Sequence, residues 1–377
     1  MNNSAERPLT SVEVNLDAIA HNVRVLKQHI GPRVDLFAVV KANAYGHGAT
    51  QVAQAALKHG AARLAVARAA EGIALREAGI TAPILVMSYT PPGEVEAAVK
   101  NSLTLAVTEP AVADQISARG QALGVPAAVH LKVDTGMGRF GLLPQEVLPF
   151  AQHLTSLPAL RIEGIFSHFA TADSTDKTYT RQQFQTFQDV LAALSAAGIT
   201  IPLRHIANSA AALDLPEMHL DAVRTGIAMY GLFPSDEILP AVSLQPALAL
   251  KSHAARVRTL PAGSSISYGR TYITPRAMSV ALIPVGYGDG YHRLNSNRGV
   301  VLINGQRAPI IGRVCMDQFV VDISHVGPVE VNAEVVLIGP QGAAQITAEE
   351  VARWAETINY EVTTSLLPRV PRFYTGG

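Results

Sequence analysis

Two lysines and two arginines lie where apolar runs of the sequence end. Lys41 follows the run FAVV, and Lys132 lies in HLKVDTGMGRFG, which also carries Arg139. Arg224 follows the apolar pair of AVRTGIAMYG. An amine in an apolar site loses its proton more readily than in water and becomes nucleophilic. These residues therefore indicate a basic site that contains a reactive amine.

A second group of residues at the ends of such runs could bind an anionic cofactor. His168 lies in FSHFATAD, and Asn208 and Ser209 lie in HIANSAA. We expect Ser209 to open the next helix as its N-cap, and Gly226-Ile227 to open a short turn. Backbone N–H groups at helix starts bind phosphate. A basic pocket with a phosphate-binding site and a lysine at a strand end indicates pyridoxal phosphate as the cofactor. The lysine would be the Schiff-base amine.

The elements that would position these residues alternate from about residue 36 to about residue 228. Short apolar, β-branched runs are followed by Ala-rich stretches of helical periodicity. Strands are predicted at 36–40, 63–67, 84–87, 104–107, 128–133, 162–167, 203–207 and 222–224. An open doubly wound sheet would have the same local pattern, but a succession of eight βα units favours a (β/α)8 barrel. Such a barrel carries its active site at the carboxyl ends of the strands.

The pattern changes after about residue 239, where strand-like runs replace the Ala-rich helices. Asn304-Gly305 predicts a hairpin turn between two of these runs. The sequence therefore predicts a (β/α)8 barrel over residues 12–239 that binds the cofactor. A mostly β domain is predicted over residues 240–377, with residues 1–11 packing near it.

Composition narrows the classes of function. The chain has 377 residues, 48% of them hydrophobic, and 30 basic residues balance 30 acidic ones. This balance indicates neither a nucleic acid nor a membrane as a partner. The single cysteine, Cys315, excludes an intramolecular disulfide. With no secretory signal in the first residues, we expect a cytoplasmic protein, and no metal site is predicted.

Nine motifs resemble, in order, those of the alanine racemases, which are fold-type III pyridoxal phosphate enzymes. The resemblance covers about residues 12–374. At Gly288 the sequence has GYGDGY where the family more often has GYADGY. The motifs are VVKANAYGHG, HLKVDTGMGRFG, HFATAD, ANSAA, VRTGIAMYG, SYGRTY, GYGDGY, GRVCMDQ and TINYEVTTSLLPRVPRFY.

The resemblance implies a pair of catalytic bases. Lys41 would be the Schiff-base lysine and the base on one face of the substrate, and Tyr268 the base on the opposite face. Racemisation needs this arrangement, because one group removes the α-proton and another returns a proton from the other side. A free tyrosine has a pKa of about 10, so Tyr268 needs a nearby cation, which the Arg224–His168 network would supply.

The resemblance also implies roles for the remaining residues. Arg224 would face the pyridine nitrogen and keep it unprotonated, which disfavours transamination, because an arginine stays protonated. Arg139 would contact the ring hydroxyl of the cofactor and the substrate carboxylate, and the Met316 backbone amide would bind the same carboxylate. Lys132 aligns with a lysine that is often carbamylated in the family. The phosphate contacts would include Tyr45, Ser209, Gly226, Ile227 and Tyr360, and the entryway would contain Tyr287, Tyr291 and Asp317.

The implied activity is the interconversion of L-alanine and D-alanine, which supplies D-alanine for peptidoglycan. The implied assembly is a head-to-tail homodimer in which Tyr268 and Met316 act in the other subunit's active site. A broad-specificity or serine racemase is one alternative. An amino-acid decarboxylase is another, but it would place an acidic residue where Arg224 stands. A pyridoxal phosphate carrier without enzymatic activity would be a single barrel without the β domain.

Each site residue also has a simpler explanation. Taken alone, Lys41 could be a strand-end lysine that extends its amine to solvent. His168 could be a core histidine that is hydrogen-bonded to the backbone. Lys132 and Asp134 could form a surface ion pair, which stabilises little. These explanations would have to hold independently at five successive strand ends, so we favour the shared site.

Overall fold

The computed structural model describes residues 8–238 and 242–377, which form two compact units. The barrel unit comprises Ala18–Ala44 and the described part of Ala49–Gln245. The β-rich unit comprises the described residues up to Asp17, with Tyr45–Gly48 and Pro246–Gly377. The domain boundary predicted between residues 239 and 240 lies outside the described residues, as do residues 1–7, so these boundaries stay a prediction.

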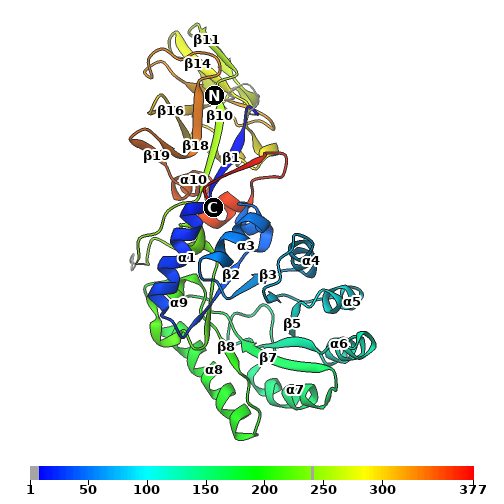
Figure 1. The fold of residues 1–377 in the computed structure, drawn as a ribbon. Coiled ribbons are helices and arrows are strands. Elements are labelled where there is room, and N and C mark those ends of the chain that lie inside the picture. The colour runs from blue at the N-terminus through cyan, green and yellow to red at the C-terminus, as the bar shows by residue number, and fades with distance from the viewer. Residues whose placement is uncertain (1–7, 239–241) are drawn as a thin grey trace. The chain divides into compact units, whose positions relative to one another are not determined.

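The barrel unit contains a closed parallel barrel (Figure 1). The sequence prediction of a (β/α)8 barrel is confirmed, and the first and last barrel strands pair with Asp35 opposite Ala222. Buried strands of this kind form nearly continuous apolar runs, which is why the sequence pattern was clear. The strands are β2 (Asp35–Val39), β3 (Arg63–Val66), β4 (Ile84–Val86), β5 (Thr104–Val107), β6 (Ala127–Lys132), β7 (Leu160–Phe166), β8 (Leu203–His205) and β9 (Ala222–Thr225).

Helices connect the barrel strands. Three of them begin with a proline, whose fixed φ suits the first helical turn. α6 is capped at its C-terminus by Gly124, whose φ of 67° is a left-handed conformation that favours glycine. The helices are α1 (Leu16–Ile30), α2 (Lys41–Tyr45), α3 (Ala49–Lys58), α4 (Ala69–Glu77), α5 (Pro92–Lys100), α6 (Pro110–Leu123), α7 (Pro144–Ser156), α8 (Thr178–Ala196), α9 (Ser209–Asp214), and the 3-10 turns η1 (Pro216–Met218) and η2 (Ile227–Tyr230).

The β-rich unit is built on a mixed sheet in the order β11-β14-β17-β16-β15-β18-β10-β1-β20, with β19 paired to β18. The strand predicted near the start of the chain, β1 (Ser11–Asn15), pairs antiparallel with β10 and parallel with β20. The predicted hairpin is confirmed, because Asn304 and Gly305 join β15 to β16 with φ 52° and 72°. The other strands are β10 (Leu248–His253), β11 (Arg256–Leu260), β12 (Ser265–Ile266), β13 (Tyr272–Ile273), β14 (Met278–Ile283), β15 (Val300–Ile303), β16 (Gln306–Ile311), β17 (Phe319–Asp322), β18 (Glu334–Gln341), β19 (Ala344–Ile346) and β20 (Arg372–Thr375).

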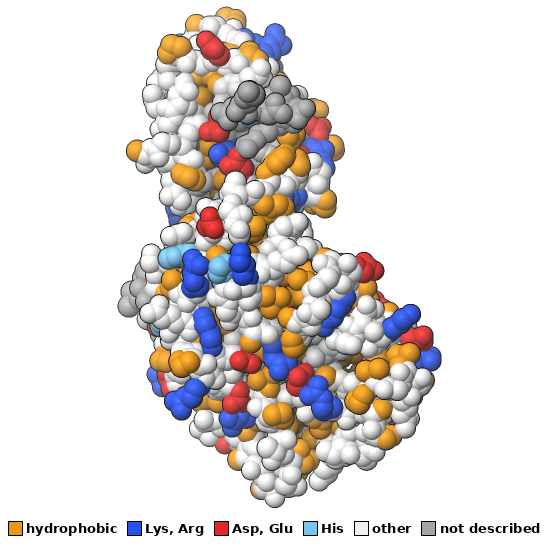
Figure 2. Space-filling view, viewed as in Figure 1, with side chains coloured by type: hydrophobic (Ala, Val, Ile, Leu, Met, Phe, Trp, Pro, Cys, Tyr) orange, Lys and Arg blue, Asp and Glu red, His pale blue; other side chains and the backbone are white. Residues whose placement is uncertain are grey.

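Short helices complete the β-rich unit. They are η3 (Tyr268–Arg270), η4 (Tyr287–Asp289), η5 (Arg293–Asn295), α10 (Ala348–Trp354) and α11 (Asn359–Thr364). Within the described ranges, no helix combines the length and the apolar content that a bilayer crossing requires. On the face shown in Figure 2, basic and acidic side chains are interspersed, in keeping with the zero formal net charge.

Candidate active site

The barrel unit brings together the basic residues that the sequence placed at strand ends. Arg224 Nη2 lies 3.2 Å from His168 Nδ1. Lys132 and Arg224 both contact the Phe166 ring, at 4.8 and 5.3 Å from its centroid. Burial lowers the pKa of His168 well below its ordinary value, and the nearby charges of Arg224, Lys132, Arg139 and Lys41 lower it further. These side chains from separate strand ends therefore share one electrostatic environment.

Lys41 lies two residues after the end of β2 and is half-buried. Burial is the main cause that lowers the pKa of its amine, and the positive charge of Arg139 adds to the effect. Glu71 acts in the opposite direction. The explanation of Lys41 as a solvent-directed lysine does not agree with this environment.

The backbone after Lys41 makes a left-handed turn. Ala42, Asn43, Ala44 and Tyr45 have φ between 52° and 54°. Left-handed helical geometry costs roughly 1–2 kcal/mol per residue with a Cβ. Surrounding contacts must therefore hold this turn in place.

Glu71 at the start of α4 supplies several of these contacts. Its Oε1 accepts the Ala42 N–H at 2.6 Å, and its Oε2 accepts the N–H groups of Ala67 and Arg68 at 2.8 and 3.0 Å. Asn43 Oδ1 accepts the Ala49 N–H at 2.9 Å. Glu71 thus ties the turn after Lys41 to the end of the neighbouring strand β3.

Arg224 is 3% exposed and donates to several acceptors. Its Nη1 lies 2.6 Å from His205 Nδ1, and its Nη2 donates to the carbonyls of Ser167 and Ile206 at 2.7 and 3.1 Å. Burial lowers its pKa to about 9, so the guanidinium stays protonated at neutral pH.

Lys132 is the last residue of β6, and Arg139 lies in the loop that follows. Lys132 is 6% exposed, so the surface ion pair considered from the sequence is wrong for this residue. Burial, followed by the charge of Arg224, lowers its pKa well below the ordinary value. Asp134 instead accepts the N–H groups of Gly136, Gly138 and Arg139 at 2.9 to 3.1 Å. Its carboxylate therefore shapes the loop that carries Arg139.

The helix starts after β8 and β9 correct one prediction. Asn208, not Ser209, is the N-cap of α9, because its backbone is extended and its Oδ1 accepts the Ala211 N–H at 3.1 Å. Ser209 is already helical, and its Oγ accepts the Gly226 N–H at 2.8 Å. Gly226 precedes η2, as predicted for the short turn that Ile227 begins. The serine hydroxyl and the N–H groups at this turn form a set of donors suited to a phosphate.

Tyr45 and Tyr360 lie together in the β-rich unit, with ring centroids 6.1 Å apart. Burial raises the pKa of Tyr45. Gly46 packs so closely on α11 that a Cβ there would lie 2.1 Å from the Thr363 carbonyl oxygen. The glycine after Tyr45 is therefore required by a close backbone approach.

The other predicted residues of the β-rich unit are mostly exposed. Tyr268 begins η3 and is 73% exposed, and Met316 is 54% exposed. Tyr287 is also exposed, whereas burial raises the pKa of Tyr291. Asp317 Oδ1 accepts from Arg369 Nη2 at 2.8 Å.

The glycine that departs from the family pattern lies beside this ion pair. A Cβ at Gly288 would lie 3.0 Å from Arg369 Nη2 and 3.0 Å from the Met316 carbonyl oxygen. Arg369 also donates from Nε to Asp289 at 2.6 Å. Gly288 therefore leaves room for the arginine that joins Asp289 to Asp317.

Sequence analysis missed several polar residues of the barrel unit. They are Glu71, His130, Glu163 and His205. A signal for one of them was available, because His130 and Lys132 are two residues apart on β6, and alternate residues of a strand share a face. The buried partners of His205 and Glu163 come from other strands and had no local signal.

Comparison with known proteins identifies the relatives of this chain. The models of the alanine racemase N-terminal domain and of the alanine racemase C-terminal domain match residues 14–234 and 247–374. The chain belongs to the alanine racemase family. Members of this family are isomerases that depend on pyridoxal phosphate, so the resemblance, enzyme class and cofactor predicted from the sequence are confirmed.

Individual relatives match this alanine racemase family member over nearly its whole length. The alanine racemase of Desulforamulus reducens is 49% identical, covering 97% of this chain and 98% of the relative. The alanine racemase of Desulfosudis oleivorans is 47% identical, with 97% and 96% covered.

Solved structures agree with these relatives. The alanine racemase of Clostridium difficile 630 has a TM-score of 0.94 at 39% identity, with 98% of this chain and 96% of that chain covered. The alanine racemase of Bacillus anthracis with bound L-Ala-P has a TM-score of 0.93 at 42% identity, with 98% and 96% covered.

Proposed function

We propose that this chain interconverts L-alanine and D-alanine, with Lys41 and Tyr268 as the two bases. The observation that carries the proposal is the Lys41 amine. It is half-buried at a strand end, and burial and Arg139 lower its pKa. Such an amine is available in its neutral, nucleophilic form at a lower pH than a lysine in water.

The residues of the barrel unit fit pyridoxal phosphate. Ser209 and the N–H groups of Gly226 and Ile227 would hold the phosphate, and Lys41 would hold the aldehyde carbon. When bound, the cofactor withdraws electrons from the α-carbon of the amino acid and so weakens its C–H bond. Phosphate contacts from Tyr45 and Tyr360 are a proposal supported by the family resemblance.

Lys41 and Tyr268 would move the proton. The neutral Lys41 amine would remove it from one face of the α-carbon or return it there, and the Tyr268 hydroxyl would do the same on the other face. Arg224, with its neighbour His168, would favour the deprotonated form of Tyr268 by charge.

The arginines would orient the reactants. Arg224 stays protonated at neutral pH, so it would keep the pyridine nitrogen of the cofactor unprotonated and disfavour transamination. This positive partner also disfavours a decarboxylase. Arg139 and the Met316 amide would bind the substrate carboxylate. The lowered pKa of Lys132 makes its amine neutral more easily, which carbamylation requires, and the modification stays a prediction.

The assembly that we propose is a head-to-tail homodimer in the cytoplasm. Tyr268 and Met316 are exposed on the β-rich unit, which supports a role for them in the other subunit's active site. Tyr287, Tyr291 and Asp317 would line the entryway. We propose no nucleic-acid or membrane partner, and D-alanine for peptidoglycan is the proposed biological product.

The proposal is tested by incubating the purified chain with pyridoxal phosphate and, separately, with L-alanine, L-serine and L-lysine. Optical inversion by chiral chromatography should be fastest for L-alanine. Faster inversion of L-serine would identify a serine racemase instead. Release of carbon dioxide from L-lysine without inversion would contradict the proposal in favour of a decarboxylase.

A further inference from the structure

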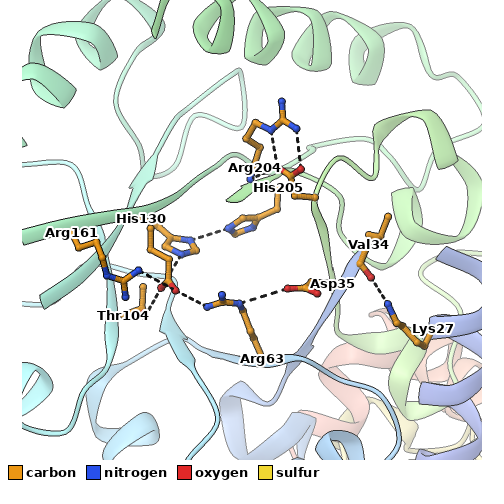
Figure 3. A network of polar contacts seen from close by, with 11 residues as sticks. Lys27, Val34, Asp35, Arg63, Thr104, His130, Arg161, Arg204 and His205 are labelled. Carbon is orange, nitrogen blue, oxygen red and sulfur yellow. Dashed lines mark hydrogen bonds and ion pairs between the residues drawn. The ribbon is translucent and has the colours of Figure 1, made fainter. Parts of the chain in front are cut away.

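A row of polar side chains crosses the interior of the barrel from Arg224 toward the other ends of the strands. His205 Nδ1 lies 2.6 Å from Arg224 Nη1, and His205 Nε2 lies 2.9 Å from His130 Nδ1 (Figure 3 shows the two imidazoles). His130 Nε2 makes no hydrogen bond among the described residues and lies 3.7 Å from Glu163 Oε2. The row starts at a cation and ends at a carboxylate, with two imidazoles between them.

The arginine determines which nitrogen of each imidazole carries the proton. Arg224 has only donors, so His205 Nδ1 must accept and its proton must lie on Nε2. That N–H then donates to His130 Nδ1, so the proton of His130 must lie on Nε2 as well. Protonating either ring fully would set two donors against each other. Burial lowers the pKa of both histidines, which agrees with neutral rings.

Glu163 at the far end imposes the same direction. The N–H of His130 Nε2 faces its carboxylate, which His130 and Arg63 together keep ionised by lowering its pKa. Arg63 Nη1 donates to Glu163 Oε1 at 2.9 Å, and Thr104 Oγ1 donates to Glu163 Oε2 at 3.1 Å. Both ends of the row therefore select the same pair of tautomers.

The barrel is shaped to hold the two rings. The Phe166 ring stacks on His205 with an interplanar angle of 6° and centroids 5.0 Å apart. A Cβ at Gly164 would lie 2.6 Å from His130 Cε1, so only a glycine leaves space for this imidazole. The register of β6 against β7 also shifts between Val129 and His130. Three separate features thus fix the positions of the rings.

The contacts of Arg224 explain why such a row is needed. Its partners are the neutral imidazoles of His205 and His168 and the carbonyls of Ser167 and Ile206. A buried cation is costly unless a negative charge compensates it. Among the described residues, Glu163 is the carboxylate that this row of contacts reaches from Arg224.

We propose that Glu163 and His130 are positioning residues that act on Arg224 through His205. Glu163 compensates the guanidinium charge of Arg224 across the barrel. Because both imidazoles have a fixed tautomer, His205 Nδ1 is always an acceptor for the Arg224 guanidinium. Arg224 is thereby held charged and in a single orientation. The expected effect on catalysis rests on the proposed function. The histidine tautomers follow from the contacts alone and are independent of that function.

The direct test is ¹⁵N NMR of the histidine rings in the full-length protein labelled with ¹⁵N-histidine. His130→Gln and His205→Gln each remove one set of signals and so assign the rings. The expected result is a proton on Nε2 of both rings at neutral pH. A proton on Nδ1 of either ring would overturn the proposal, and this measurement needs neither cofactor nor activity.

The role of Glu163 is tested by Glu163→Gln, with Asp221→Asn as the matched control. Asp221 pairs with Arg204 at 2.7 Å in the same barrel and contacts neither histidine of the row. In E163Q, the ¹⁵N shift of His205 Nδ1 should move toward that of a free acceptor. With L-alanine, kcat should fall roughly tenfold with little change in KM, the effect of losing one hydrogen bond to a charged group.

Each outcome with E163Q either supports or overturns the role of Glu163. A shifted His205 signal in E163Q and an unchanged signal in D221N support the row, even if the enzyme does not racemise alanine. An unchanged signal in E163Q, or the same change in both variants, overturns it. If E163Q does not fold, the histidine tautomers of the wild-type protein still test the proposal.

Discussion

The two units of the molecule present their predicted site residues in opposite ways. In the barrel unit, Lys132 and Arg224 are 6% and 3% exposed, and burial lowers the pKa of both side chains. In the β-rich unit, Tyr268 and Met316 are 73% and 54% exposed. The barrel therefore modifies the chemistry of its residues by removing water from them. The β-rich unit instead displays its two residues on the surface.

This difference separates effects on stability from effects on activity. Buried charges in the barrel depend on many partners, so changing one disturbs the fold as well as the site. Exposed residues of the β-rich unit contribute little to stability, so changing one should affect activity alone. The following changes test this division, from the largest expected effect to the smallest.

Lys41→Ala tests the barrel side of the comparison. It should lower racemisation of L-alanine by more than about a thousandfold, because both the amine and one base are lost. Its free energy of unfolding should change as well, because the side chain is half-buried and interacts with Arg139 and Glu71. Chiral chromatography and circular dichroism measure the two effects. Activity within tenfold of wild type would show that another residue is the base.

Tyr268→Phe tests the β-rich side. It should lower racemisation by roughly a hundredfold and reduce solvent-deuterium exchange from one enantiomer more than from the other. Its free energy of unfolding should stay within about 0.5 kcal/mol of wild type, because the side chain is exposed. Tyr89→Phe, at an exposed tyrosine of the barrel unit, is the control for both measurements. An equal loss of exchange for both enantiomers would argue against two bases.

Glu71→Gln tests whether the turn after Lys41 depends on its carboxylate. The glutamine amide would place N–H donors opposite the backbone N–H donors of Ala42, or of Ala67 and Arg68. The free energy of unfolding should therefore fall by about 2 kcal/mol. Glu77→Gln, on the exposed part of the same helix, should change little. Urea unfolding of both variants measures the difference. Equal stabilities would mean that the turn is held by other contacts.

Glu163→Gln should make unfolding less sensitive to acid. His130 and Arg63 lower the pKa of Glu163 in the folded state from its ordinary value of 4.5. Its stabilisation is therefore complete above that value and is lost as the pH falls toward the folded pKa. Between about pH 7 and about pH 3.5, the advantage of wild type over E163Q should shrink by about 1 kcal/mol. A constant difference in urea unfolding would contradict this coupling.

Ala42→Gly should have the smallest effect and the opposite sign. Ala42 has φ 52° and is exposed, so a glycine relieves backbone strain with little loss of packing. Stability should rise by about 0.5 kcal/mol. Ala192→Gly, on the exposed side of helix α8, should lower it by about 1 kcal/mol. A loss of stability in A42G would show that the turn is not strained.

The strands and the residues at their ends were predictable because the signals are local. A buried strand must be apolar, and a charged residue at its end, such as Lys41 or Arg224, is conspicuous against it. The helix start at Asn208 was placed one residue late, since asparagine and serine are both good N-caps. Backbone geometry decides between such neighbours.

The sequence by itself determined the barrel, the cofactor class and the positions of Lys41 and Tyr268 in the motifs. Only the tertiary structure decided that Glu71 holds the left-handed turn and that His205, His130 and Glu163 form one row behind Arg224. The physical reason is the range of the interactions. Strand and helix patterns repeat over a few residues, whereas a buried hydrogen bond joins residues that meet only when the barrel has closed.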